Sequence, residues 1–139
     1  RVLPRGTENI LLVDDEAGLA ELGKRMLGLL GYQVEARTSP LAALEVFRAN
    51  PDTFDAVITD MTMPHLTGWS LAREILAIRP ETPILLCTGF SDQANEEKAR
   101  SAGIRTFLFK PLVMQDLATA VREALDGPAG NKPREQRPL

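Results

Sequence analysis

Five polar side chains that could do chemistry stand at the ends of short apolar runs in the sequence. They are Asp14, Asp15, Asp60, Thr88 and Lys110. In an open parallel sheet the carboxyl ends of the strands lie along one edge, where ligand crevices form. If the apolar runs are strands of such a sheet, these five side chains meet although they are far apart in sequence.

Three carboxylates brought together in this way repel one another, because two unit charges about 4 Å apart cost about 4 kcal/mol at an effective dielectric near 20. A purely structural role for the three Asp residues is therefore costly unless a cation offsets the repulsion. Oxygen ligands without His or Cys suit Mg²⁺ (or Mn²⁺), which typically takes one or two carboxylates, several waters and a phosphate oxygen. Lys110 adds positive charge for a phosphoryl group, and Thr88 adds a hydroxyl donor. The set suits transfer of a phosphoryl group to a carboxylate beside the metal ion.

The elements that must position these residues alternate along the chain. Apolar runs predict strands at residues 10–13, 32–36, 56–58, 83–87 and 106–109. A helical pattern follows each run. Five repeats of strand then helix predict an α/β fold, with an open five-stranded parallel sheet and helices on both faces.

Helical periodicity also predicts which side chains the helices bury. The first helix is expected to bury Leu19, Leu22, Met26 and Leu29, the second Leu41, Leu44 and Phe47, the third Ala72, Ile75 and Leu76, and the last Val113, Leu117, Ala120, Val121 and Ala124. The helix at residues 91–102, with Ser91 as its N-cap, offers only alanines as apolar contacts. It is therefore expected to be weakly held and movable.

Composition and charge exclude several classes of protein. With 139 residues, 44% hydrophobic and 25% charged, the chain has the make-up of one globular domain. That domain is expected to span 9–126, between an N-terminal linker (1–8) and a flexible tail (127–139) rich in Pro, Gly and charge. No apolar run is long enough to cross a bilayer, and residues 1–8 do not show the pattern of a signal peptide. The net charge of −3, with basic residues gathered at the ends, disfavours nucleic-acid binding by this chain alone.

The single cysteine, Cys87, excludes an internal disulfide and indicates the reducing cytoplasm. Because it lies in an apolar run, it is expected to pack as a small buried side chain.

The chemical motifs resemble those of a known family, the CheY-like receiver domains of two-component response regulators. The matching residues are Val13-Asp14-Asp15-Glu16, Asp60-Met61-Thr62-Met63-Pro64 with Gly68, Thr88-Gly89 and Lys110-Pro111. Together they cover the whole of 9–126. The resemblance implies a flavodoxin-like (βα)5 three-layer sandwich with strand order 2-1-3-4-5. It also implies a phosphoacceptor signalling module rather than an enzyme that turns over a separate substrate.

The resemblance assigns a role to each site residue. Asp60 would be the phosphoacceptor and, with Asp15 and the backbone carbonyl of Thr62, would coordinate Mg²⁺. Asp14 would act mainly through metal-bound water.

The resemblance also assigns roles to residues around the phosphorylation site. Thr88 and Lys110 would contact the new phosphoryl group, Phe107 stands at the aromatic switch position, and the bond before Pro111 would be cis. Phe90 would border the path of the hydrolytic water and slow the loss of the phosphoryl group.

The donor is expected to act in trans. The only histidine, His65, follows Pro64 in a loop, whereas a phosphodonor histidine in this signalling system lies on a helical partner, a sensor histidine kinase or a histidine phosphotransfer domain. The segments 5–10 and 87–91 resemble receivers of hybrid sensor histidine kinases. The output face, and a possible homodimer interface, would be the helix at 91–102 with the fifth strand and the last helix.

Alternatives remain at this point. Asp14 could simply cap the first helix, and Asp60 could be a turn residue, although neither explains Lys110 and Thr88 at matching strand ends. A Mg²⁺-dependent phosphatase with an aspartyl nucleophile is the second candidate function. It usually needs another Asp two residues after the nucleophile, where this chain has Thr62. A flavin-binding module would need a hydroxyl-rich phosphate loop after the first strand, where this chain has Asp14-Asp15-Glu16. A degenerate receiver would lack part of the acidic set, which is complete here.

Overall fold

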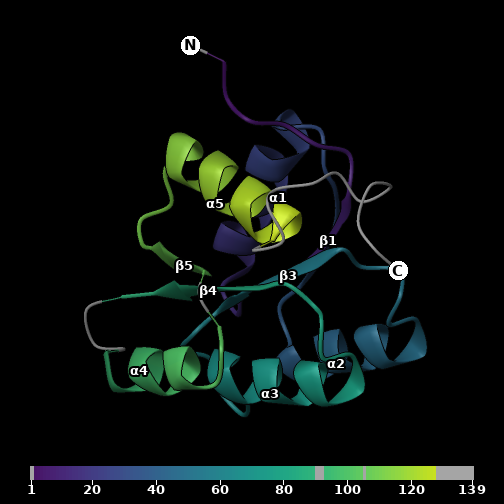
Figure 1. Ribbon diagram of the computed structural model, residues 1–139, viewed down its shortest axis with the longest axis vertical. Coiled ribbons are helices and arrows are strands. Elements are labelled where there is room, and N and C mark those ends of the chain that lie inside the picture. Colours follow the sequence, from purple (N-terminus) through teal and green to yellow (C-terminus); the bar gives the residue numbers. More distant parts are fainter. Residues whose placement is uncertain (1, 90–92, 105, 128–139) are drawn as a thin grey trace.

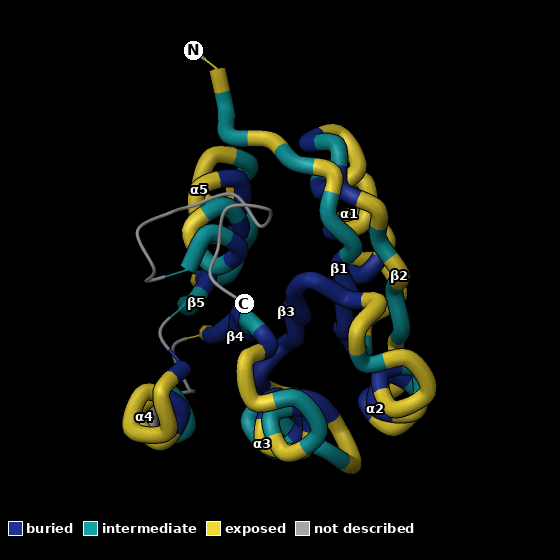
Figure 2. Tube along the Cα trace, turned by 45° about the vertical axis from the view of Figure 1, so that its right-hand side comes forward, coloured by how far each residue is buried: buried dark blue, intermediate teal, exposed yellow. Residues whose placement is uncertain are grey.

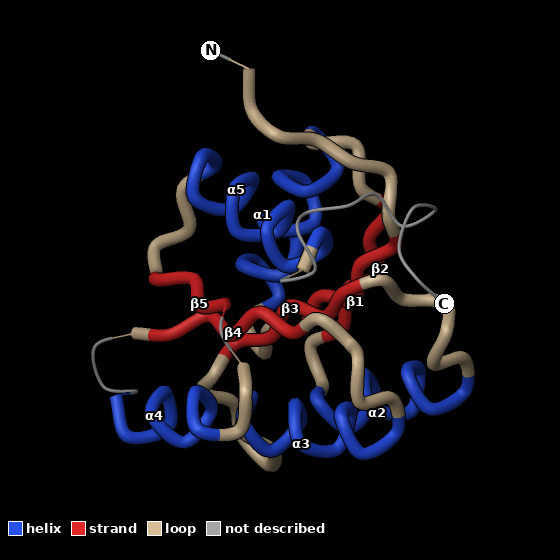
Figure 3. The backbone as a smooth tube through the Cα atoms, viewed as in Figure 1, coloured by secondary structure: helices blue, strands red, loops and turns tan. Residues whose placement is uncertain are grey.

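The structure is a computed structural model that describes residues 2–89, 93–104 and 106–127. Strands and helices alternate along it: β1 (Asn9–Val13), α1 (Ala17–Leu29), β2 (Gln33–Arg37), α2 (Pro40–Ala49), β3 (Ala56–Asp60), α3 (Gly68–Ile78), β4 (Ile84–Thr88), α4 (Gln93–Ser101), β5 (Thr106–Phe109) and α5 (Met114–Asp126). The strands form one parallel sheet in the order β2-β1-β3-β4-β5 (Figure 3). Helices α1 and α5 cover one face, and α2, α3 and α4 cover the other (Figure 1). The predicted fold class and strand order are confirmed.

Burial separates the central strands from the edge strands. Every residue of β3 and β4 is buried, and so is β1 after Asn9, as expected for strands covered by helices on both faces. The edge strand β2 alternates between exposed and partly buried positions. Buried positions gather along the strands and on the helix sides that face them (Figure 2). The apolar pattern of the sequence therefore places the sheet in the middle layer.

The buried face of α1 differs from the prediction. Leu19, Leu22 and Leu29, which were expected to be buried, are exposed; Leu22 keeps 48% of its surface and Leu29 69%, while Met26 is partly buried. The helix instead buries Ala20, Gly23 and Leu27. A Cβ at position 23 would press on the Leu12 side chain of β1, so α1 packs through small residues close to the sheet. The larger leucines are left on the outside.

Two more predictions of burial are wrong, both at the N-terminal end of a helix. Leu41 at the start of α2 is exposed, whereas Ala43, Leu44 and Phe47 fill the core. Val113 is also exposed, because it is the N-cap residue of α5 and precedes its buried face. The helices themselves lie where they were predicted.

Helix α4 begins at Gln93, so the predicted N-cap Ser91 lies outside the described residues. Among the described side chains of α4, only Ala99 is buried. No helix in the described part of the chain is both long and apolar enough to span a membrane.

The segment before β1 has no regular secondary structure, yet it lies against the domain (Figure 1). The Gly6 N–H donates to the Leu30 carbonyl (3.1 Å), and the Arg122 guanidinium of α5 donates to the Arg5 carbonyl (3.0 Å) and to Glu8 (2.7 Å). Gly31 has a φ of 102°, and a Cβ there would overlap the Gly6 carbonyl oxygen. Residues 5–8 therefore bridge the C-terminal ends of α1 and α5.

Candidate functional site

The three predicted metal-binding carboxylates meet at the carboxyl edge of the sheet. One oxygen each from Asp14, Asp15 and Asp60 lies within 4.8 Å of the others. Asp14 follows β1 and Asp60 ends β3, and these neighbouring parallel strands bring them together. Asp14 and Asp60 are buried, whereas Asp15 is closer to the surface.

Lys110 points into this cluster. Its Nζ lies 2.9 Å from Oδ1 of Asp60 and 3.7 Å from Oδ2 of Asp14. Its backbone N–H donates to the Thr88 carbonyl (3.1 Å), and the following Lys110–Pro111 peptide bond is cis. Four of the residues that the sequence placed at strand ends therefore form one charged cluster.

Asp14 has a second role at the start of α1. Its Oδ1 accepts a hydrogen bond from the Glu16 N–H (3.0 Å), while Oδ2 faces Lys110. The N-cap residue of α1 is Glu16, which makes no side-chain cap hydrogen bond, so the ordinary explanation of Asp14 as the N-cap is wrong. One carboxylate oxygen of Asp14 instead supports the turn before the helix, and the other faces the charged cluster.

The loop after β3 folds back tightly onto the backbone of Asp60. The Met61 N–H donates to the Cys87 carbonyl (2.9 Å), and the Gly68 N–H donates to the Met61 carbonyl (2.8 Å). A Cβ at position 68 would collide with the Asp60 carbonyl oxygen, so only glycine allows α3 to start this close. The Thr67 hydroxyl accepts from the Ser70 N–H (3.1 Å) and caps α3. The close return fixes the backbone of Asp60.

Burial has the largest effect on the pKa of Asp60 and raises it. The hydrogen bond and charge of Lys110 lower this pKa, and the Asp14 and Asp15 carboxylates raise it, so that the net shift is upward. Burial lowers the pKa of Lys110. The hydrogen bond to Asp60 and the charges of Asp60 and Asp14 outweigh this effect, so the pKa of Lys110 is raised. The cluster thus holds more negative charge than one lysine balances. Such a site favours an additional cation.

Thr88 and Phe107 lie on the same face of the sheet. Thr88 pairs with Phe109 and Leu86 with Phe107, and alternate residues of a strand share a face. Leu86 belongs to the core beneath α2, α3 and α4, against which Phe107 also packs. Thr88 is fully buried, and no described group hydrogen-bonds its Oγ1. The two predicted switch residues are diagonal neighbours on the α4 side.

The remaining predictions have separate outcomes. Cys87 is buried, and burial raises the pKa of its thiol to about 12, which leaves it unreactive. His65 is an exposed loop residue with a φ of 72°. Phe90 lies outside the described residues.

One contact next to the predicted switch was not foreseen in the sequence. The guanidinium of Arg100, on α4, lies over the Phe107 ring. The only available signal was the spacing of Glu96 and Arg100, four residues apart on one helix, which predicts an ion pair but says nothing of a ring.

Comparison with known proteins is consistent with this geometry. The family model described as "Response regulator receiver domain" matches residues 10–122. Among curated proteins, the sensor kinase CckA of Brucella abortus is 31% identical over 87% of this chain and 13% of its own length. The sensor protein EvgS of Escherichia coli is 38% identical over 80% of this chain and 9% of its own length. The chain therefore spans only a small part of these relatives.

Solved structures share the fold. A response regulator receiver domain protein from Clostridium thermocellum superposes with a TM-score of 0.83 at 35% identity, covering 86% of this chain and 94% of that one. The receiver domain of the sensor histidine kinase PA1611 from Pseudomonas aeruginosa gives a TM-score of 0.77 at 27% identity, covering 88% and 100%. The latter was solved with a magnesium ion coordinated in its active site cleft.

Proposed function

Because the chain belongs to the response regulator receiver domain family, we propose that it is a cytoplasmic phosphoacceptor of a two-component system that takes a phosphoryl group onto Asp60. The observation that carries the proposal is the contact of Asp60 with Lys110 at 2.9 Å inside the cluster with Asp14 and Asp15. A carboxylate nucleophile beside a fixed positive charge suits phosphoryl transfer, in which positioning and electrostatics supply most of the catalysis.

In this reaction a carboxylate oxygen of Asp60 forms the new bond to phosphorus while the bond from phosphorus to the donor nitrogen breaks. The electron pair of that bond stays with the imidazole of the donor histidine, which takes up a proton. Lys110 would move from Asp60 to a phosphoryl oxygen, because neutralisation of Asp60 by the new bond leaves the phosphoryl group as the stronger anion. Because Asp60 is buried, water has little access to compete with it for the phosphoryl group.

The donor set fits Mg²⁺. Asp14, Asp15 and Asp60 supply only oxygen ligands, and their negative charge exceeds what Lys110 balances. These side chains, with the Thr62 carbonyl, would hold the ion, which when bound neutralises charge on the phosphoryl oxygens. Mn²⁺ has similar ligand preferences.

The phosphatase alternative has weaker support. It needs an acid two residues after the nucleophile to protonate the leaving group, and the hydroxyl of Thr62 is a poor acid at neutral pH. We therefore place the chain among signalling modules rather than among enzymes.

Incubation with acetyl phosphate and Mg²⁺ tests the proposal. Intact mass spectrometry is expected to show addition of a single phosphoryl group, and a chelator such as EDTA is expected to prevent it. Steady release of phosphate from aryl phosphate esters, without a labelled protein, would instead support the phosphatase.

The physiological donor is proposed to be a sensor histidine kinase or a histidine phosphotransfer domain, with this chain as part of a hybrid kinase or as a separate relay. We propose that the signal leaves through the face formed by α4, β5 and α5, with homodimerisation through this face as one form of output.

The exposed leucines of α1 give a testable prediction about the donor. Helix α1 starts directly after the site, so a donor that reaches Asp60 would cover its outer side, including Leu22. Leu22→Glu is expected to slow transfer from the cognate donor at least about tenfold, because a charge would be buried in an apolar contact. Labelling by acetyl phosphate should not change, because the small donor does not cover α1.

Leu41→Glu is the matched control for this experiment. Leu41 is similarly exposed (55%, against 48% for Leu22) but lies on α2, at the opposite face of the sheet. Equal slowing by both variants, or none by Leu22→Glu, would show that the donor does not use α1.

A further inference from the structure

We infer that Arg100 holds Phe107 in the conformation seen here and thereby opposes the phosphorylated state of the domain; this inference rests on the proposed function. The Arg100 guanidinium carbon lies 4.2 Å from the centre of the Phe107 ring. This is well within the distance at which a cation is attracted to an aromatic face. Arg100, an exposed residue of α4, thus contacts the aromatic residue that is the diagonal neighbour of Thr88.

Glu96 fixes the position of the guanidinium. Its Oε1 lies 2.8 Å from Nη2 of Arg100, one helical turn away on α4. The Glu96 side chain is only 17% exposed and that of Arg100 is 52% exposed, so the acid is the more enclosed partner of the pair. The pair therefore holds the charge over the ring.

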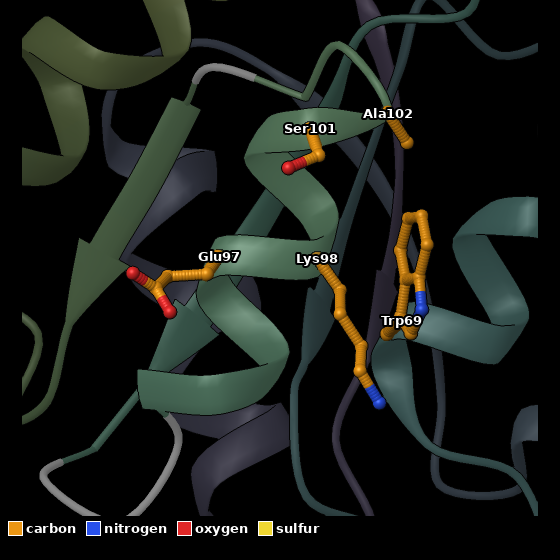
Figure 4. Close-up of a pocket in the computed structure, with 5 residues that line it drawn as sticks. All are labelled: Trp69, Glu97, Lys98, Ser101 and Ala102. Atoms are coloured by element: carbon orange, nitrogen blue, oxygen red, sulfur yellow. The ribbon is translucent and has the colours of Figure 1, made fainter.

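The Phe107 contact matters because α4 has few other attachments. Ala99 is its only buried side chain among those described. On the α3 side an open groove of about 630 Å³ is lined by Trp69, Glu97, Lys98, Ser101 and Ala102. Figure 4 shows Lys98 beside Trp69 along this groove, with Glu97 pointing away from the indole. The contact with Phe107 is therefore one of the few described contacts between α4 and β5.

Thr88 connects this contact with Asp60. Its buried hydroxyl has no hydrogen-bond partner among the described groups, so a phosphoryl oxygen at Asp60 would be a favourable acceptor. Movement of Thr88 toward Asp60 would open space beside the diagonal neighbour Phe107. The ring can fill this space only by leaving the Arg100 guanidinium. Loss of the guanidinium should therefore make the phosphorylated conformation easier to reach.

The test uses beryllofluoride, a non-covalent mimic of the phosphoryl group, with saturating Mg²⁺ and titration calorimetry. Arg100→Ala is expected to bind beryllofluoride about two- to fivefold more tightly than the wild type, the range given by a partly exposed cation–π contact. Removal of a positive charge would by itself weaken binding of an anion. Tighter binding therefore cannot be a general electrostatic effect.

Two further variants test the mechanism. In a Phe107→Leu background, Arg100→Ala is expected to have no effect, because the ring on which the guanidinium acts is gone. Arg48→Ala is the matched control, since Arg48 is similarly exposed (56%) and pairs with Glu74 between helices, with no ring contact among the described residues. Its affinity for beryllofluoride should equal that of the wild type.

Unchanged or weaker binding by Arg100→Ala would overturn the inference, and so would an effect that persists in the Phe107→Leu background. If the wild type itself binds no beryllofluoride in Mg²⁺, the proposed function is wrong and the inference falls with it. The two failures are therefore distinguishable in one set of titrations.

Discussion

Asp60→Asn is expected to abolish phosphoryl incorporation from acetyl phosphate. An amide is not a nucleophile toward phosphorus at neutral pH, and loss of a nucleophile lowers the rate by at least about a thousandfold. Intact mass spectrometry in Mg²⁺ should show only unmodified protein. Asp52→Asn, a change at an exposed loop position, is the control and should be labelled like the wild type. If the Asp60→Asn protein were labelled, the phosphoacceptor would instead be Asp14 or Asp15.

The same variant is expected to be more stable than the wild type at neutral pH without Mg²⁺. The pKa of Asp60 is raised by burial and by its carboxylate neighbours. The folded wild type therefore binds the Asp60 proton more tightly than the unfolded chain does. Its stability falls as the pH rises from the usual value of 3.8 through the raised pKa, and the loss is complete above that pKa.

Urea denaturation at a series of pH values measures this difference. The advantage of Asp60→Asn should be present at neutral pH and shrink as the pH falls through the raised pKa, where the wild type becomes protonated. Saturating Mg²⁺ should also reduce it, because the ion compensates the charge that Asn removes. An advantage that stayed constant with pH would mean that the Asp60 charge is not its cause.

Lys110→Met is expected to lower the rate of labelling by acetyl phosphate by about 10²- to 10³-fold, the usual loss when a fixed group that stabilises developing charge is removed. Met retains much of the length of the side chain but none of its charge. Asp60 and the rest of the acidic cluster would remain, so slow labelling should persist. The rate at saturating Mg²⁺ is the measurement that checks this.

Mg²⁺ affinity should change in the opposite direction. Without the ammonium group 2.9 Å from Asp60, the pocket is more negative and Lys110→Met should bind Mg²⁺ more tightly than the wild type. Lys24→Met, at an exposed position of α1, should alter neither quantity. A variant that lost labelling together with Mg²⁺ binding would point to a collapsed pocket, and near-normal labelling would exclude a role for Lys110 in transfer.

Much of the fold and of the charged cluster could be predicted because both follow from chain order. Parallel strands end at one edge, so residue types at strand ends are enough to bring Asp15, Asp60 and Lys110 together. The burial predicted for α1 was wrong because small side chains let the helix approach the sheet more closely than large ones do. In α1 the largest apolar residues were expected inside, but Gly23 lies against Leu12, and the helix is turned by about 100°, one residue, from the expected face.

Contacts that join separate elements could not be predicted in this way. The hydrogen bond from the Glu16 N–H to Asp14 is local, and the expected alternative of an N-cap was wrong only in which residue begins α1. The placement of Arg100 over Phe107 depends instead on how α4 lies beside β5. No periodicity in either segment encodes that relation, because α4 offers almost no apolar side chains that would fix its rotation.

The bridge formed by residues 5–8 affects how chimeric proteins should be joined. A fusion that attaches a foreign sensor at residue 9, where β1 begins, would keep every strand and every residue of the acidic cluster. It would nevertheless remove the carboxylate of Glu8 and the Arg5 carbonyl, and the partly buried Arg122 would retain only Asp126 as its ion-pair partner among the described residues. Loss of a hydrogen bond to a charged group costs about 1.5–3 kcal/mol. A junction at residue 2 or earlier keeps this anchor and is the better design.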